Sequence, residues 1–108
     1  MSLLESAIAW IELRNHILVP FIDERGEEDG ATIPPAEVTL GELRRAFDNR
    51  KHTLKMRGGV PAENVGLRKD AKNLTEEIAC FATVIAAAEI FLVDENDPVL
   101  DAVRNNLP

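Results

Sequence analysis

The chain has 108 residues, of which 45% are hydrophobic and 29% are charged, and its formal net charge at pH 7 is −7. This length and composition fit a single domain covering residues 1–108 and exclude intrinsic disorder. The single cysteine, Cys80, excludes an internal disulfide and a thiolate metal cluster, and a cytoplasmic location is expected.

The first predicted helix runs from Leu3 to about Leu18. Ser2 and Glu5 have the spacing of a capping box at its start. Pro20 lacks a backbone N–H and restricts the residue before it, so the helix should end or kink there.

Three polar residues interrupt the apolar pattern of this first helix. On a helical wheel Asn15 falls within the main apolar stripe, Arg14 within a second one, and His16 on the polar face. A buried charge needs a partner, and Glu89 is the only acid in the apolar run near the C-terminus. We therefore expect Arg14 and Glu89 to form a buried ion pair, within one chain or across a dimer, and Asn15 to be a satisfied core amide. The alternatives are a solvent-directed Arg14 and a ligand-binding Asn15.

The next segment, from about residue 23 to residue 38, is rich in acids, glycine and proline. This composition predicts a solvated loop, and its length is unusual for a structureless connection. We expect the loop to be mobile or functional. No strand is predicted, because alternation of period two is absent and Pro34 and Pro35 interrupt the segment.

A second helix should begin after Thr39, which forms a capping box with Glu42, and should end near Gly58. Its apolar residues share one face, namely Leu40, Leu43, Phe47 and Leu54. Residues 44–57 also form a basic face, with Arg44, Arg45, Arg50, Lys51, Lys55 and Arg57.

The third helix is predicted from a heptad-like seam and should continue to Asn96. The seam consists of Leu67, Ala71, Leu74, Ile78, Phe81, Ile85, Ala88 and Leu92. Its second half is apolar on every side, so it should be covered on every side. Because the chain has few other helices, we expect self-association to supply part of the cover. The expected interface residues are Ile78, Phe81, Ile85, Ala86 and Phe91.

The apolar run of residues 78–93 is shorter than the roughly 20 residues of a membrane span, so no membrane contact is expected. Cys80 lies in this run and should be an inert buried thiol. A short fourth helix should follow Asp97-Pro98 and present Val99, Leu100, Val103 and Leu107. The expected fold is therefore all-α: a dimeric bundle of three main helices and a short C-terminal helix.

One alternative function rests on Arg45 and His52, which lie on one face of the second helix with Asn49 between them. Their spacing is similar to the Arg-x(4–6)-His pattern of HEPN-type RNases, which are small helical proteins that dimerise. The resemblance implies that His52 acts as acid or base and that Arg45 stabilises charge on the phosphodiester. It covers only these positions of the chain.

We expect a small non-catalytic helical protein that acts by forming a homodimer or by binding a protein partner. Nucleic-acid binding through the basic face is the alternative, and the net charge of −7 disfavours it. No cofactor or metal ion is expected, because Glu76 and Glu77 are followed by Cys80 where a magnesium-binding helix of the MazG type has a third acid.

Overall fold

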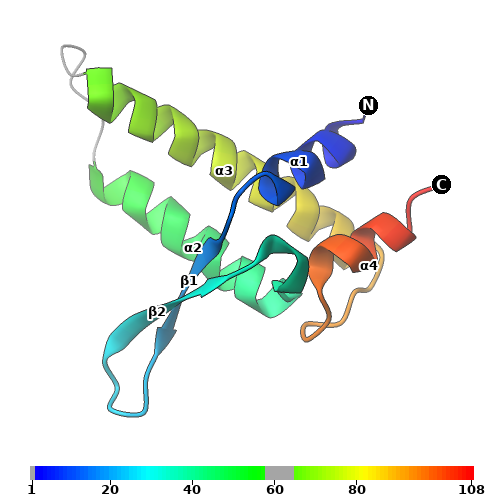
Figure 1. The fold of residues 1–108 in the computed structure, drawn as a ribbon, viewed down its shortest axis with the longest axis horizontal. Helices are drawn as coiled ribbons and strands as arrows, with labels where there is room; N and C mark the ends of the chain where they lie inside the picture. Colours follow the sequence, from blue (N-terminus) through cyan, green and yellow to red (C-terminus); the bar gives the residue numbers. More distant parts are fainter. Residues whose placement is uncertain (1, 58–64) are drawn as a thin grey trace.

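The computed structural model describes residues 2–57 and 65–108, with side chains described for residues 2–56 and 72–108. These residues form a mixed α/β fold, so the expectation of an all-α fold is wrong. The elements in chain order are α1 (Leu3–Glu12), β1 (Ile17–Ile22), β2 (Glu28–Ile33), the 3-10 turn η1 (Pro35–Glu37), α2 (Leu40–Arg57), α3 (Val65–Ile90) and α4 (Val99–Asn105) (Figure 1).

The helix α1 begins as the sequence indicates but ends much earlier than Leu18. The capping box is confirmed: the Glu5 N–H donates to the Ser2 hydroxyl at 3.1 Å, and the Ser2 N–H donates to the Glu5 carboxylate at 3.3 Å. The helix ends at Glu12, and β1 starts at Ile17. Ile17 and Val19 are buried while Leu18 between them is exposed, which is the period-two pattern of a strand.

The segment expected to be a mobile loop contains β2 and η1 instead. Strands β1 and β2 pair antiparallel, from Ile17 opposite Ile33 to Ile22 opposite Glu28. Pro20 is tolerated because this two-stranded sheet consists only of edge strands. The hairpin turn is held by Asp23, whose carboxylate accepts the backbone N–H groups of Arg25 and Glu27 at 2.9 Å each.

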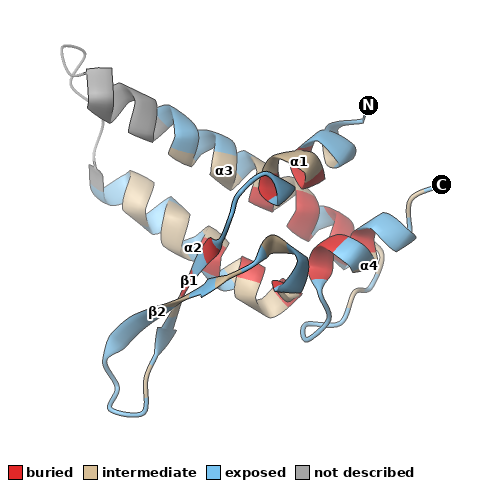
Figure 2. Cartoon of the chain, viewed as in Figure 1, coloured by how far each residue is buried: buried red, intermediate tan, exposed pale blue. Residues whose placement is uncertain are grey.

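The helices α2 and α3 lie antiparallel and side by side, while α1 and α4 pack against α3 (Figure 1). The capping box at the start of α2 is confirmed by hydrogen bonds between Thr39 and Glu42. Most of the buried residues lie where α1, α4, the first half of α2 and the second half of α3 meet (Figure 2). The largest side chains that are fully buried are Phe81, Ile8, Ile11, Leu40, Leu43, Val19, Val38, Val84, Val99 and Val103.

The helix α3 ends at Ile90 rather than at Asn96. Leu92 adopts a left-handed conformation with φ 57°, and the N–H of Val93 donates to the carbonyl of Ala88 at 2.9 Å. This is the bonding pattern of a Schellman motif, which stops the helix. Within the described residues, no helix is both long and apolar enough to cross a membrane.

The β-hairpin extends away from the helices and leaves much of its length uncovered (Figures 1 and 2). Its base is buried at Ile17 and Val19, whereas Phe21 and Ile22 towards the turn are exposed. The outer part of the hairpin therefore exposes large apolar side chains to solvent.

Candidate functional site

The two polar residues expected in the core lie on the surface. Arg14 and Asn15 follow the end of α1 and are exposed, and His16 is exposed as expected. The Arg14 guanidinium stacks over the Trp10 ring at 3.9 Å from the ring centroid, and its Nε donates to the Trp10 carbonyl at 3.2 Å. Because the helix has already ended, the helical wheel does not apply to these two residues.

Within the chain, the expected buried ion pair between Arg14 and Glu89 is not formed. Glu89 is exposed and lies 3.2 Å from Arg44 of α2, which also lies 3.0 Å from Glu95. No polar or charged residue is buried in the described part of the chain. The contacts of Arg44 join the start of α2 to the end of α3 and to the loop that follows it.

The apolar half of α3 is covered by the chain itself on only part of its circumference. Phe81 and Ile85 are buried in the core, so they are not available to a second chain, contrary to expectation. Ile78 and Phe91 are half-buried, and Ala86 is exposed. The side chains of Leu67 and Ala71, which begin the predicted seam, lie outside the described residues.

Four residues spaced four, three and four apart form one line along α3 that the core does not bury. We call this line the α3 stripe; it consists of Ala79, Thr83, Ala86 and Ile90. Thr83 is half-buried and the other three are exposed, and Ile90 exposes 76% of its surface. This spacing places all four side chains on the same face of the helix.

The α3 stripe continues onto α1 across a shallow apolar cleft of about 190 Å³. Leu3 and Trp10 line this cleft from α1, and Ala79, Cys80 and Thr83 line it from α3. Leu3 is 77% exposed. We call the α3 stripe together with Leu3 and Trp10 the α1/α3 face.

The thiol of Cys80 lies in this cleft and is half-buried. Burial raises its pKa above the ordinary value, as does the charge of Glu76; Arg14 acts in the opposite direction, and Glu77 raises the pKa further. A thiol with a raised pKa is a poor nucleophile at neutral pH.

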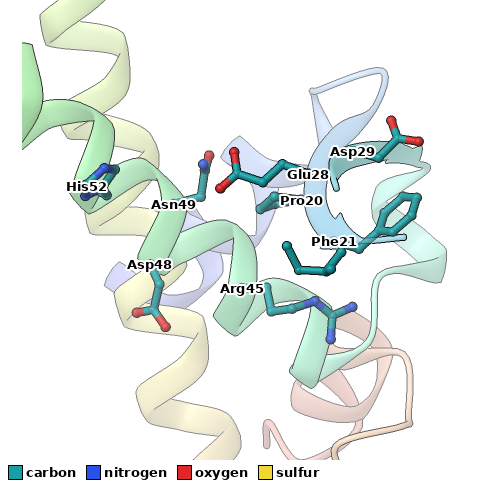
Figure 3. A pocket seen from close by; sticks show the side chains of 9 residues that line it. Pro20, Phe21, Glu28, Asp29, Arg45, Asp48, Asn49 and His52 are labelled. Carbon is teal, nitrogen blue, oxygen red and sulfur yellow. The ribbon is translucent and has the colours of Figure 1, made fainter. Parts of the chain in front are cut away.

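A larger open groove of about 560 Å³ lies between the hairpin and α2 (Figure 3). It brings together the three residues of the RNase-like alternative, Arg45, Asn49 and His52, on the α2 side. The other lining residues are Asp48 of α2 and, from the hairpin, Pro20, Phe21, Ile22, Glu28 and Asp29. The hairpin wall of this groove was not predicted from the sequence, because no strand was expected there.

The groove carries carboxylates beside its cations. Glu28 reaches towards Asn49 in Figure 3. Among the described residues, neither Glu28 nor Asp29 forms an ion pair, and Asp48 has only Lys51 at 3.5 Å. Carboxylates next to Arg45 and His52 would repel a phosphodiester. The arrangement therefore disfavours RNA cleavage in this groove.

Two arginines of the predicted basic face of residues 44–57, Arg44 and Arg50, are engaged in contacts between elements of the fold. Arg50 is tied to three elements: it forms an ion pair with Glu77 of α3, donates to Asn49 of α2 at 2.7 Å, and donates to the carbonyl of Leu18 in β1 at 2.7 Å. Arg44 is held by the two acids described above. These contacts remove two cations from the face that a polyanion would meet.

Neither a protein-family model, nor a curated protein, nor a solved structure matches the chain. Within the described residues, no group of three or more histidine, cysteine, aspartate or glutamate side chains is arranged to hold a metal ion.

Proposed function

We propose that the chain is a non-catalytic protein that self-associates as a homodimer through the α1/α3 face. One observation carries this proposal: the α3 stripe stays largely exposed, with only Thr83 half-buried, although it lies in the most apolar part of α3. A helix that is apolar on all sides normally has neighbours on all sides. A second copy would provide the missing neighbour.

The chemistry of the face suits contact between helices. Ala79, Thr83 and Ala86 are small, so a neighbouring helix could approach to the lower end of the usual range, about 8 Å between axes. Leu3, Trp10 and Ile90 supply larger apolar side chains around them. Because a two-fold dimer buries the same patch on both copies, a single self-complementary face is sufficient.

Light scattering after size exclusion, over a range of protein concentrations, tests the proposal. We expect the wild-type mass to rise from that of a monomer to that of a dimer with concentration. The Ala86→Arg protein should remain monomeric, because an exposed alanine on a helix accepts arginine without loss of fold, but the new charge would be buried between copies.

The matched control is Asn73→Arg, which adds the same charge at an exposed position of α3 away from the stripe. This protein should dimerise like the wild type, and circular dichroism should show equal helix content in all three proteins. A wild-type protein that stays monomeric at high concentration would refute the proposal. Equal weakening of the dimer by both substitutions would refute the assignment of the face.

A further inference from the structure

We infer that the groove between the hairpin and α2 is a docking site for a basic segment of a partner protein, one in which apolar side chains stand beside lysine or arginine. The groove shares no lining residue with the α1/α3 face. The inference does not depend on dimer formation, and it concerns a different ligand.

The apolar contribution comes from side chains that the fold leaves uncovered at the outer part of β1. Phe21 is 38% exposed and Ile22 is 63% exposed, and Pro20 is half-buried beside them. All three line the groove opposite α2. Large apolar side chains held beside polar ones are typical of the anchor region of a binding groove.

The hairpin that carries these side chains is held in shape by its turn. The carboxylate of Asp23 accepts two backbone N–H groups, its own N–H donates to the carbonyl of Glu27 at 2.9 Å, and its carbonyl accepts the N–H of Gly26 at 3.0 Å. Gly26 takes a φ of 77°, which favours glycine. Because the hairpin is already ordered, a ligand that binds to it causes a smaller loss of conformational entropy.

The charge of the hairpin selects a cationic ligand. Glu28 and Asp29 line the groove without an ion pair among the described residues, and Glu24 and Glu27 lie exposed in and beside the turn, with Arg25 the single cation there. The net charge of −7 adds long-range attraction for a basic partner.

The α2 wall adds selectivity. Asn49 and His52 offer polar groups across from Glu28, and Asp48 adds a carboxylate that is only weakly engaged by Lys51. Arg45 lines the end of the groove that is farther from His52 (Figure 3). It would repel a uniformly basic segment there, so the ligand should present an apolar or acidic residue at that end.

Binding of short labelled peptides, followed by fluorescence anisotropy, tests the inference. A peptide that alternates leucine and lysine should bind, and its affinity should fall as salt rises. A serine–lysine peptide of equal charge should bind more weakly, because it lacks apolar anchors. A leucine–glutamate peptide and a single-stranded RNA oligonucleotide should not bind.

Matched variants locate the site. Glu28→Lys should weaken binding of the leucine–lysine peptide by about fivefold or more, as expected for reversal of one partly exposed ion pair. Glu37→Lys makes the same change at an exposed residue outside the groove and should have a much smaller effect. Ile22→Ser should weaken binding of the leucine–lysine peptide but should not change binding of the serine–lysine peptide.

Three outcomes would overturn the inference. Equal weakening by Glu28→Lys and Glu37→Lys would mean that only overall charge attracts the peptide. Binding of the RNA oligonucleotide but not of the peptide would mean that the groove binds a nucleic-acid backbone instead of a basic protein segment. A change of oligomeric mass on Glu28→Lys, with peptide affinity unchanged, would make the groove a contact between copies of this chain.

Discussion

Arg50 of α2 and Glu77 of α3 form an ion pair in which the two side chains are only 12% and 22% exposed. The same guanidinium donates to the carbonyl of Leu18 in β1 at 2.7 Å and so joins the hairpin to both long helices. Arg50 therefore positions the wall of the groove as well as the two helices.

Replacing Arg50 with methionine should lower the free energy of unfolding by about 2 kcal/mol, because it removes hydrogen bonds made by a charged, poorly exposed group. Urea denaturation of Arg50→Met, Glu77→Gln and the double variant measures this loss and the coupling between the two residues. Losses that add within about 0.3 kcal/mol would contradict the pairing.

The pair between Arg104 of α4 and Glu12 at the end of α1 should contribute less. Both side chains are about half exposed to solvent, which weakens their attraction. Arg104→Met should cost less than about 1 kcal/mol in the same denaturation experiment. A loss as large as that of Arg50→Met would mean that burial does not explain a difference in stability between the two ion pairs.

Leu92→Gly should stabilise the protein by about 1 kcal/mol, because Leu92 is exposed and its φ of 57° is a conformation that glycine adopts freely. Thermal melting measures the change. Leu13→Gly is the control, since Leu13 is also a largely exposed leucine but has φ −73°. That substitution should destabilise, and a rise in Tm for both variants would contradict the explanation.

Gly26→Ala should destabilise the turn of the hairpin by about 1 kcal/mol. An added methyl group would meet nothing within 4 Å, so the whole effect comes from the positive φ of 77°. Amide hydrogen exchange at Gly26 and Glu27 should accelerate, because their N–H groups donate to Asp23. Unchanged exchange would show that the turn does not depend on this conformation.

The reactivity of Cys80 should depend on pH in a way set by its raised pKa. The thiolate is the reactive form, so the alkylation rate of the folded protein should rise at higher pH than that of the urea-unfolded protein. Glu76→Gln should lower the pH midpoint of this alkylation profile, and Arg14→Gln should raise it. Identical pH profiles for folded and unfolded protein would contradict the burial of this thiol.

The same shift gives a contribution to stability whose sign follows from linkage. The folded protein holds the Cys80 proton more tightly than the unfolded chain does, because the folded-state pKa is the higher of the two. This contribution is complete below the pKa of the unfolded thiol and is lost as the pH rises through the folded-state pKa. Cys80→Ala should remove that part of the alkaline loss of stability.

Local signals in the sequence were sufficient for several parts of the fold. The two capping boxes place the starts of α1 and α2 correctly, because a hydroxyl and a carboxylate three residues apart satisfy N–H groups that a helix start leaves unpaired. The apolar spacing also identifies the buried residues of α4, namely Val99, Leu100 and Val103, whereas Leu107 lies beyond the end of the helix and is half-buried.

The hairpin could not be recognised from the same pattern. Ile11, Leu18 and Ile22 fit a helical stripe, while Ile17 and Val19 fit a strand, and a segment this short supports either period. The strongest strand signals were the β-branched residues before Pro20 and the glycine of the turn at Gly26. Because the segment was taken as helix, neither the hairpin wall of the groove nor the surface position of Arg14 was predicted.

The partner of Glu89 could not be predicted because it depends on packing between α2 and α3. A lone acid in an apolar run suggests a buried charge, yet the carboxylate lies on the surface beside Arg44, where water and the guanidinium both reach it. The exposure of the α3 stripe likewise depends on how the helices pack, so it was not predicted either. The sequence shows an apolar half-helix, and only the fold shows which side stays uncovered.

Disulfide cross-linking tests self-association through the α1/α3 face most directly. In a Cys80→Ala background, single cysteines would replace Ala79, Ala86 or Ile90 of the α3 stripe, with Asn73→Cys as the control on the same helix. Under mild oxidation, we predict that at least one stripe position forms a covalent dimer much faster than the control. Equally slow cross-linking at all four positions would contradict dimerisation through this face.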